Sequence, residues 1–265
     1  MARKVVITGL GATTPIGGDV PTMWKNALKG VSGAHTLEDD WVAKYELPVH
    51  FAARATTPAT EVLSRVEAKR MDPSTQFAVV ASREAWADAG SPDVDPERIA
   101  VVIGSGIGGA LTILGQYDVL RDSGPRRVSP HLIPMLMPNG PAATVGLELK
   151  ARAGVHTPVS ACASGAEALA FALDLLRAGR ADVVIAGGAE ACVHPLPMAA
   201  FGLGTGTLAA YAAQMMGGQH WMDCGQANYG FQQDTNDPVD KNQLHRASAL
   251  RAPHGPYSTR FHSRG

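Results

Sequence analysis

The sequence predicts an α/β fold in which helices pack on a mainly parallel, mixed sheet. The first observation is a recurring order of segments: a short β-branched run, a glycine-rich loop and a helical stretch. The runs are KVVIT at residues 4–8, IAVVI at 99–103 and ADVVIA at 181–186. The second observation is a helical segment at 166–176 that is apolar on nearly all sides, which indicates burial between other elements. Alternating strands and helices of this kind are typical of layered α/β folds.

The N-terminal run at residues 4–8 is expected to form a buried strand, because Gly9 and Gly11 follow it and start a turn-rich loop. A helix is expected next, over residues 23–29. Gly30 should end that helix, since glycine commonly follows the last helical turn.

The middle of the chain repeats this order. Ser74 is expected to cap a helix that continues to residue 89, and Gly90 follows it directly. The next buried strand is the run at 99–103, which opens into the loop GSGIGGA. A further helix is expected over residues 111–121.

Composition limits the classes of function. The chain has 265 residues, of which 45% are hydrophobic, so it can bury a sizeable core in one large domain or two small ones. A formal net charge of -1 argues against a chain that as a whole grips nucleic acid or an anionic membrane. No segment has the length and apolarity expected of a signal peptide or a membrane span.

The three cysteines, Cys162, Cys192 and Cys224, form no CxxC pair and no zinc-type spacing with histidines. The thiols are therefore expected to be reduced, which favours a cytoplasmic protein without a bound metal.

The character of the sequence changes after residue 201. Six of the eight glutamines follow this point, and clear strand runs are no longer seen. The last residues, HRASALRAPHGPYSTRFHSRG, have no apolar periodicity. We therefore predict a domain over residues 1–201 and a poorly ordered tail over residues 202–265.

Cys162 lies in PVSACASGAEALA, where a strand-like run is expected to give way to a buried helix. A nucleophile at such a turn is exposed above the sheet, as in the nucleophile elbow of hydrolases. The helix N-terminus favours the thiolate form, and its N–H groups can stabilise an oxyanion. The small neighbours Ala161, Ala163, Ser164 and Gly165 leave room for a substrate. From these residues alone, an inert, buried cysteine is an equally good interpretation.

Longer motifs decide between these interpretations. The stretches VVITGLGATTPIGGD, VVIGSGIGG, GPRRVSPHLIPMLMPNGPAA, GVHTPVSACASGAEAL and ADVVIAGGAEACVHPLPMAAF occur in this order. Together they resemble the β-ketoacyl-acyl carrier protein synthases of the elongating, type II class, and most of all the actinobacterial enzymes of fatty acid and mycolic acid elongation. The resemblance covers about three quarters of the chain and implies a thiolase-like fold.

The resemblance implies that Cys162 is the covalent nucleophile of a 3-oxoacyl-acyl carrier protein synthase. In the family, an acyl group moves from acyl carrier protein to this cysteine, and malonyl carrier protein is decarboxylated. The resulting carbanion then attacks the acyl thioester. By motif position, Ile107 and Leu132 line the acyl pocket, although both are equally plausible as core residues. No cofactor is implied, and the expected assembly is a homodimer, or a heterodimer with a full-length synthase.

Acyl carrier protein is acidic, so its docking site should be basic. Lys69 and Arg70 in EAKRMD, and Arg126 and Arg127 in GPRRVSP, match the positions at which the family docks it. The alternative is that these pairs are ordinary solvated surface charges.

The family has a second, similar half that carries two histidines, a lysine and a glycine-rich phenylalanine turn. The sequence LGTGT at residues 203–207 has leucine where the family motif has histidine, and we interpret the similarity as coincidence. We assign no role to the tail histidines, which are His220, His245, His254 and His262. Acyl transfer to Cys162 is then the activity that the chain itself supports. The alternative is a non-catalytic or truncated partner that dimerises with a full-length synthase.

A dinucleotide site is a further alternative, because Gly104, Gly106 and Gly109 have the G-x-G-x-x-G spacing. A complete fingerprint also needs a second strand with an acidic residue at its end. The following stretch is instead expected to be a helix and a loop, so the glycines alone do not predict such a site.

Overall fold

A computed structural model describes residues 4–203 and 227–233 of the chain. These residues belong to one compact unit that ends at Gln233, and a second unit over residues 234–265 lies outside the described residues. In chain order the elements are β1 (Val5–Ala12), α1 (Val20–Leu28), β2 (Ala34–Thr36), α2 (Asp40–Lys44), β3 (Phe51–Ala53), η1 (Ala59–Glu61), α3 (Arg65–Ala68), α4 (Pro73–Asp88), η2 (Pro96–Arg98), β4 (Ile99–Gly104), α5 (Ala110–Ser123), η3 (Pro125–Arg127), α6 (Leu132–Leu136), α7 (Gly140–Glu148), β5 (Gly154–His156), η4 (Ala161–Ala163), α8 (Ser164–Arg177), β6 (Val183–Gly188), α9 (Pro195–Leu203) and β7 (Ala227–Gln233).

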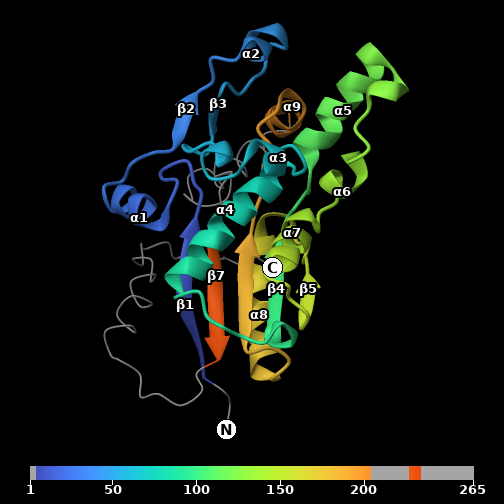
Figure 1. Ribbon diagram of the computed structural model, residues 1–265. Coiled ribbons are helices and arrows are strands. Elements are labelled where there is room, and N and C mark those ends of the chain that lie inside the picture. Colours follow the sequence, from blue (N-terminus) through green and yellow to red (C-terminus); the bar gives the residue numbers. More distant parts are fainter. Residues whose placement is uncertain (1–3, 204–226, 234–265) are drawn as a thin grey trace, which may run out of the picture. The chain divides into compact units, whose positions relative to one another are not determined.

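The main sheet has five strands in the order β1-β7-β6-β4-β5 (Figure 1). Strands β6, β4 and β5 are parallel, whereas β7 runs antiparallel to both β1 and β6. A separate antiparallel hairpin pairs β2 with β3. The predicted α/β class with a mixed sheet and a parallel section is therefore confirmed.

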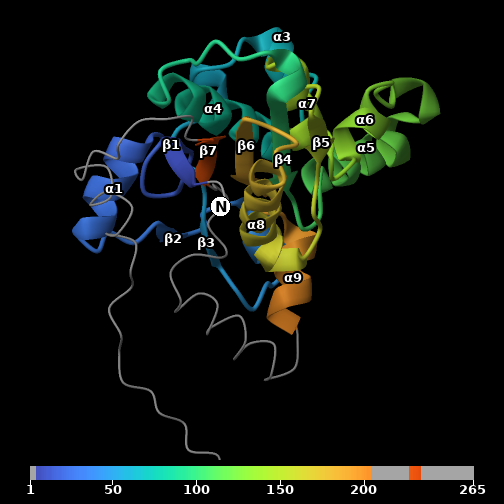
Figure 2. The same ribbon diagram turned by 90° about the horizontal axis from the view of Figure 1, so that it is seen from below.

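Helices cover both faces of this sheet, and Figure 2 shows α4 and α7 on one side of the strands and α8 on the other. Alternation along the central strands explains the layering, because successive side chains point to opposite faces. Val101 and Ile103 pack in the cluster with α4 and α7, whereas Val102 packs with α8. Every residue of β4 and β6 is buried, so these two strands form the centre of the core.

Strand β1 lies directly on α4. A Cβ atom on Gly11 would lie 1.8 Å from the carbonyl oxygen of Ala81, so only glycine allows this approach. Glu84 of α4 accepts hydrogen bonds from the N–H groups of Ala12 and Val20, both at 2.8 Å. Burial raises the pKa of the Glu84 carboxyl above its ordinary value.

Two sequence predictions about local structure are wrong. Asp72, not Ser74, caps α4: its Oδ1 accepts from the backbone N–H and the hydroxyl of Ser74 at 2.9 and 2.7 Å. A strand also occurs where none was expected, because β7 (Ala227–Gln233) pairs in the main sheet. Its pairing with β1 and β6 is non-local, and such pairing is poorly visible in local sequence.

Helix α8 was expected to be buried between other elements, but in the described residues it is buried on one side only. Ala168 and Ala172 are fully buried against the sheet, whereas Ala166 and Ala170 are exposed. The predicted domain boundary near residue 201 falls within α9 and remains a prediction. No described helix has the length and apolarity needed to cross a membrane.

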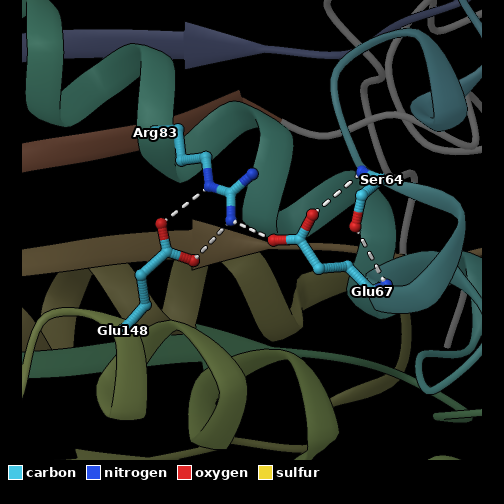
Figure 3. Close-up of polar contacts among 4 residues, drawn as sticks. All are labelled: Ser64, Glu67, Arg83 and Glu148. Atoms are coloured by element: carbon cyan, nitrogen blue, oxygen red, sulfur yellow. Dashed lines mark hydrogen bonds and ion pairs between the residues drawn. The ribbon is translucent and has the colours of Figure 1, made fainter.

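Arg83 of α4 joins three helices through two carboxylates (Figure 3). It donates to Glu148 of α7 at 2.7 and 3.2 Å and to Glu67 of α3 at 2.9 Å. Glu67 also forms a capping box with Ser64, in which each side chain bonds the other's backbone N–H. The hydrogen bond from Arg83, with that from Ser64, lowers the pKa of Glu67 to about 2.

This lowered pKa predicts a loss of stability in acid. A carboxylate whose pKa is lower in the folded state stabilises the fold above its unfolded pKa, and the contribution is lost as pH falls towards the folded value. We expect Glu67→Gln to lower Tm near neutral pH, because the amide keeps the capping acceptor but loses the charge. The difference from wild type should narrow between about pH 5 and about pH 3.

Thermal unfolding followed by circular dichroism across this pH range measures the effect. The control is the same substitution in an Arg83→Met background, where the narrowing should be smaller because only the Ser64 hydrogen bonds still lower the pKa of Glu67. A Tm difference that stays constant with pH in the wild-type background would contradict the prediction.

Candidate functional site

Cys162 lies in the short 3-10 turn η4, between strand β5 and helix α8. Its thiol is free and exposed, which supports the predicted reactive cysteine rather than an inert core residue. The connection differs in detail from the expected elbow, because β5 ends at His156 and residues 157–160 separate it from the turn.

The turn holds a strained backbone. Ala161, directly before Cys162, has a φ of +49°, a left-handed conformation that costs a residue with a Cβ about 1–3 kcal/mol. Ser164 holds it in place: its hydroxyl donates to the carbonyl of Ala161 at 2.7 Å and accepts from the N–H of Ser160 at 2.9 Å. Strain of this kind often presents a reactive side chain, as at a nucleophile elbow.

The N–H groups of Ala163 and Ser164 donate within the turn to the carbonyls of Ser160 and Ala161. An oxyanion bound at Cys162 would therefore need donors other than these two amides. The hydroxyl of Ser160 donates to Glu167 in the first turn of α8, which adds a side-chain bond between the turn and the helix.

Two glycines let the end of β4 approach the cysteine turn. A Cβ on Gly104 would lie 2.4 Å from the carbonyl oxygen of Ser164, and one on Gly106 would lie 3.3 Å from that of Ala161. Any larger residue at Gly104 would displace the start of α8. The glycine loop after β4 and the turn that carries Cys162 thus form one packed unit.

The carboxylate of Glu190, two residues after the end of β6, binds this glycine loop. Glu190 Oε2 accepts hydrogen bonds from the N–H groups of Gly106 at 2.8 Å and Ile107 at 3.0 Å. Burial raises the pKa of the Glu190 carboxyl above its ordinary value, and the negative charge of Asp72 acts in the same direction. Glu190 Oε1 is buried and has no hydrogen-bond partner among the described residues.

The rest of the loop is held by further hydrogen bonds. Gly108 donates to the hydroxyl of Ser105 at 2.9 Å, and Gly109 donates to the carbonyl of Leu136 in α6 at 3.0 Å. At the start of α5, Asp72 Oδ2 accepts from the backbone and the hydroxyl of Thr112 at 3.0 and 2.7 Å.

These bonds argue against the dinucleotide alternative. A pyrophosphate binds the free N–H groups of such a loop, but here Gly106 and Ile107 already donate to a carboxylate. The glycines serve close packing instead, since a Cβ on Gly109 would lie 2.2 Å from the carbonyl oxygen of Met135.

The two predicted pocket residues lie on neighbouring segments. Ile107 is on the glycine loop and its side chain is 49% exposed, so it is not an ordinary core residue. Leu132 is half-buried at the start of α6, the helix whose Leu136 carbonyl binds the loop at Gly109. The structure therefore places both on segments joined by a backbone hydrogen bond.

The four predicted docking residues are all exposed and lie on two elements. Lys69 and Arg70 follow α3, and Arg126 and Arg127 lie in η3 after the end of α5. None of the ion pairs found among the described residues uses these four side chains.

Sequence reasoning missed the polar residues that shape the site: Glu190, Asp72, Ser164 and Thr112. A signal for Glu190 exists, because a lone carboxylate directly follows the apolar run of β6 at the carboxyl end of a parallel strand, where α/β proteins place functional groups. The tail histidines at positions 220, 245, 254 and 262 and most of the LGTGT stretch lie outside the described residues. Within the described part of the chain, no group of three metal-ligating side chains is found.

Comparison with known proteins identifies relatives for most of this chain. Residues 2–214 match the family model for the beta-ketoacyl synthase N-terminal domain. The chain is 44% identical over 197 residues to 3-oxoacyl-(acyl-carrier-protein) synthase 2 of Mycobacterium bovis, which covers 74% of this chain and 47% of the relative. It is 42% identical over 202 residues to the protein of the same name from Staphylococcus aureus, covering 75% and 48%. The chain thus spans about half the length of these relatives.

Among solved structures, the fold resembles a beta-ketoacyl synthase from Burkholderia phymatum with a TM-score of 0.70 and 25% sequence identity. The match covers 93% of this chain and 61% of that structure. The thiolase-like ketosynthase fold predicted from the motifs is confirmed by this likeness.

The Ser164 hydroxyl predicts a measurable contribution to the turn. Ser164→Ala removes two hydrogen bonds, each worth about 0.5–1.5 kcal/mol, so we expect a loss of about 1–3 kcal/mol in unfolding free energy. Amide hydrogen exchange in the segment around Cys162 should become faster, because only the backbone N–H of residue 164 then still binds the strained Ala161 carbonyl. Urea unfolding and exchange mass spectrometry measure the two effects.

Thr144→Ala is the matched control, since the Thr144 hydroxyl bonds only the carbonyl of Gly140 within its own helix. It should leave exchange around Cys162 unchanged. Equal exchange in wild type and Ser164→Ala would contradict the prediction.

Proposed function

The chain belongs to the beta-ketoacyl synthase family, and we propose that it takes an acyl group from acyl carrier protein onto Cys162. It would thus act as the acyltransferase part of a 3-oxoacyl-acyl carrier protein synthase in fatty acid biosynthesis. The observation that carries this proposal is the free, exposed thiol of Cys162 on a strained turn. The names of the relatives at 42–44% identity support the same reaction class.

In the proposed transfer, the thiolate Sγ of Cys162 attacks the carbonyl carbon of the acyl thioester. A bond forms between Sγ and this carbon, the bond from the carbon to the carrier sulfur breaks, and the carrier leaves as a thiolate that takes up a proton. The glycine packing of β4 and its loop against the turn supports the proposal, because Gly104 and Gly106 let these segments pack against Ser164 and Ala161, which lie on either side of Cys162 in the chain. Ile107 and Leu132 would then contact the acyl chain.

Complete synthesis needs a second step, in which malonyl carrier protein loses CO2 and its carbanion attacks the acyl group on Cys162. The resemblance assigns that step to histidines of the family's second half, and this chain spans only 47% of its mycobacterial relative. We therefore propose condensation only where equivalent groups are supplied, either by a further segment of the protein or by a second polypeptide. The competing proposal is a non-catalytic partner of a full-length synthase.

Exposed apolar side chains support association with another chain. Ile113, Tyr117 and Leu120 lie on one side of α5 and are each more than two-fifths exposed. Strand β5 forms one edge of the sheet in the described residues, and its Val155 is 39% exposed. A homodimer, or a heterodimer with a full-length synthase, would cover such surfaces. A cytoplasmic location is a prediction from the cysteine pattern alone.

The first test of the proposal is intact-mass spectrometry of the purified protein after incubation with acyl carrier protein that carries a labelled acyl group. We expect the mass to increase by one acyl group in wild type and not in Cys162→Ala. Cys192→Ala is the matched control, because it removes a thiol outside the turn and should still be acylated.

The same assay with a full-length synthase added separates the two proposals. Acylation of Cys162 in the chain alone supports the transferase. Acylation only in the mixture supports an active heterodimer, whereas none in either case would leave only the non-catalytic partner.

The exposed basic pairs predict how the carrier docks. Charge reversal at Lys69 and Arg70, or at Arg126 and Arg127, should slow acyl transfer from the acidic carrier protein by about tenfold. Transfer from a small acyl thioester should stay unchanged, because it does not use the docking surface. Reversal of Lys25 and Lys29, two exposed lysines of α1, is the control and should have no effect. Equal slowing with both acyl donors would contradict the docking role.

A further inference from the structure

We propose that Glu190 is a positioning residue that fixes Ile107 against the Cys162 turn and thereby sets how an acyl chain enters the site. This inference rests on the proposed acyl transfer, because Ile107 matters only if Cys162 carries an acyl chain. It concerns the carboxylate's hydrogen bonds to the backbone, and it assigns Glu190 no contact with the substrate.

Few hydrogen bonds hold the glycine loop at residues 106–109 in place. From Gly106 to Gly109 each N–H group has one acceptor: Glu190 for Gly106 and Ile107, Ser105 for Gly108 and Leu136 for Gly109. Glu190 is thus the single acceptor for the residue that carries the pocket side chain.

The backbone next to Glu190 is itself held in the sheet. Ala189, directly before it, is buried and donates to the carbonyl of Gly104 at 3.0 Å, which continues the pairing of β6 with β4. The carboxylate oxygen that binds the loop would lie 3.1 Å from a Cβ on Gly106. A rigid strand end therefore holds the carboxylate, and the carboxylate holds the loop.

Without the hydrogen bonds to Glu190, we expect the loop at residues 106–109 to become more mobile. Ile107 is half-exposed, so water can replace Glu190 as the acceptor of its N–H group if the carboxylate is removed. The core strands do not depend on that bond. Removal of the carboxylate should consequently loosen the Ile107 segment while the chain stays folded.

The same loop packs against the turn that carries Cys162. A Cβ on Gly106 would lie 3.3 Å from the carbonyl oxygen of Ala161, the residue before Cys162, so a shift of the loop would change its packing against the turn that carries the thiol. In the wild type, an acyl chain attached at Cys162 would contact Ile107 in a fixed position. Small misplacements of such a contact commonly cost large factors in rate.

The test measures alkylation of Cys162 by two reagents that need no carrier protein. The first reagent is iodoacetamide, and the second is N-dodecyl iodoacetamide, which carries a long alkyl chain. Peptide-level mass spectrometry gives the rate at Cys162 for each. We expect Cys162 of the wild type to react faster with the long reagent than with iodoacetamide. In Glu190→Ala, the ratio of the long-reagent rate to the iodoacetamide rate should fall by about tenfold.

Two variants serve as controls. Glu190→Gln keeps an oxygen that can accept both N–H groups and should keep most of the wild-type ratio. Glu84→Ala removes another half-buried glutamate that accepts two backbone N–H bonds, but at β1 and not at the glycine loop. It should lower stability and leave the ratio unchanged.

Amide hydrogen exchange gives a second reading of the same variants. Exchange in the segment that contains Gly106 and Ile107 should be faster in Glu190→Ala and close to wild type in Glu190→Gln. A ratio near one in wild type, or equal ratios and equal exchange in wild type and Glu190→Ala, would overturn the proposal. Failure of acyl transfer from the carrier with the expected reagent ratios would instead refute the proposed function, and only the positioning of Ile107 by Glu190 would remain supported.

Discussion

The close approach of strand β4 to the start of α8 is the constraint on which the site depends. Gly104 lies so near the carbonyl of Ser164 that no side chain fits between them. Because the strand is buried on both faces, it cannot move away to accept a larger residue. The glycine loop, the strained Ala161 and the Cys162 thiol all take their positions from this contact.

Two acidic side chains hold backbone segments in place by hydrogen bonds, which the apolar core cannot provide. Asp72 is fully buried and joins the starts of α4 and α5, and Glu190 binds the loop between β4 and α5. Buried carboxylates are costly unless their oxygens accept hydrogen bonds, and both bond backbone N–H groups. Removing either acceptor would take away the protein partner of N–H groups in the loop or at the helix starts. The two acidic residues thus fix backbone geometry around the cysteine.

Several apolar surfaces of the described residues are open to solvent. The side of α8 at Ala166 and Ala170 is exposed, and α5 carries an exposed apolar row. The relatives of the family are about twice as long as this chain's match to them. An additional polypeptide segment or partner would bury these faces, and the hydrophobic effect would favour that association.

The sequence by itself determined the layers and singled out Cys162 as the candidate nucleophile. Strands β4 and β6, helices α4, α5 and α8, and Cys162 could be predicted because apolar runs, helix-ending glycines and long motifs are local signals.

Only the tertiary structure decided how these parts meet. The pairing of β7, the bonds from Thr112 to Asp72 and the bond from the Ile107 N–H to Glu190 each join residues far apart in the chain. The open side of α8 also followed only from the structure, because apolarity on all sides shows what a helix can bury and not which neighbours are present. Local pattern reports propensity, whereas hydrogen bonds between distant segments depend on the packed geometry.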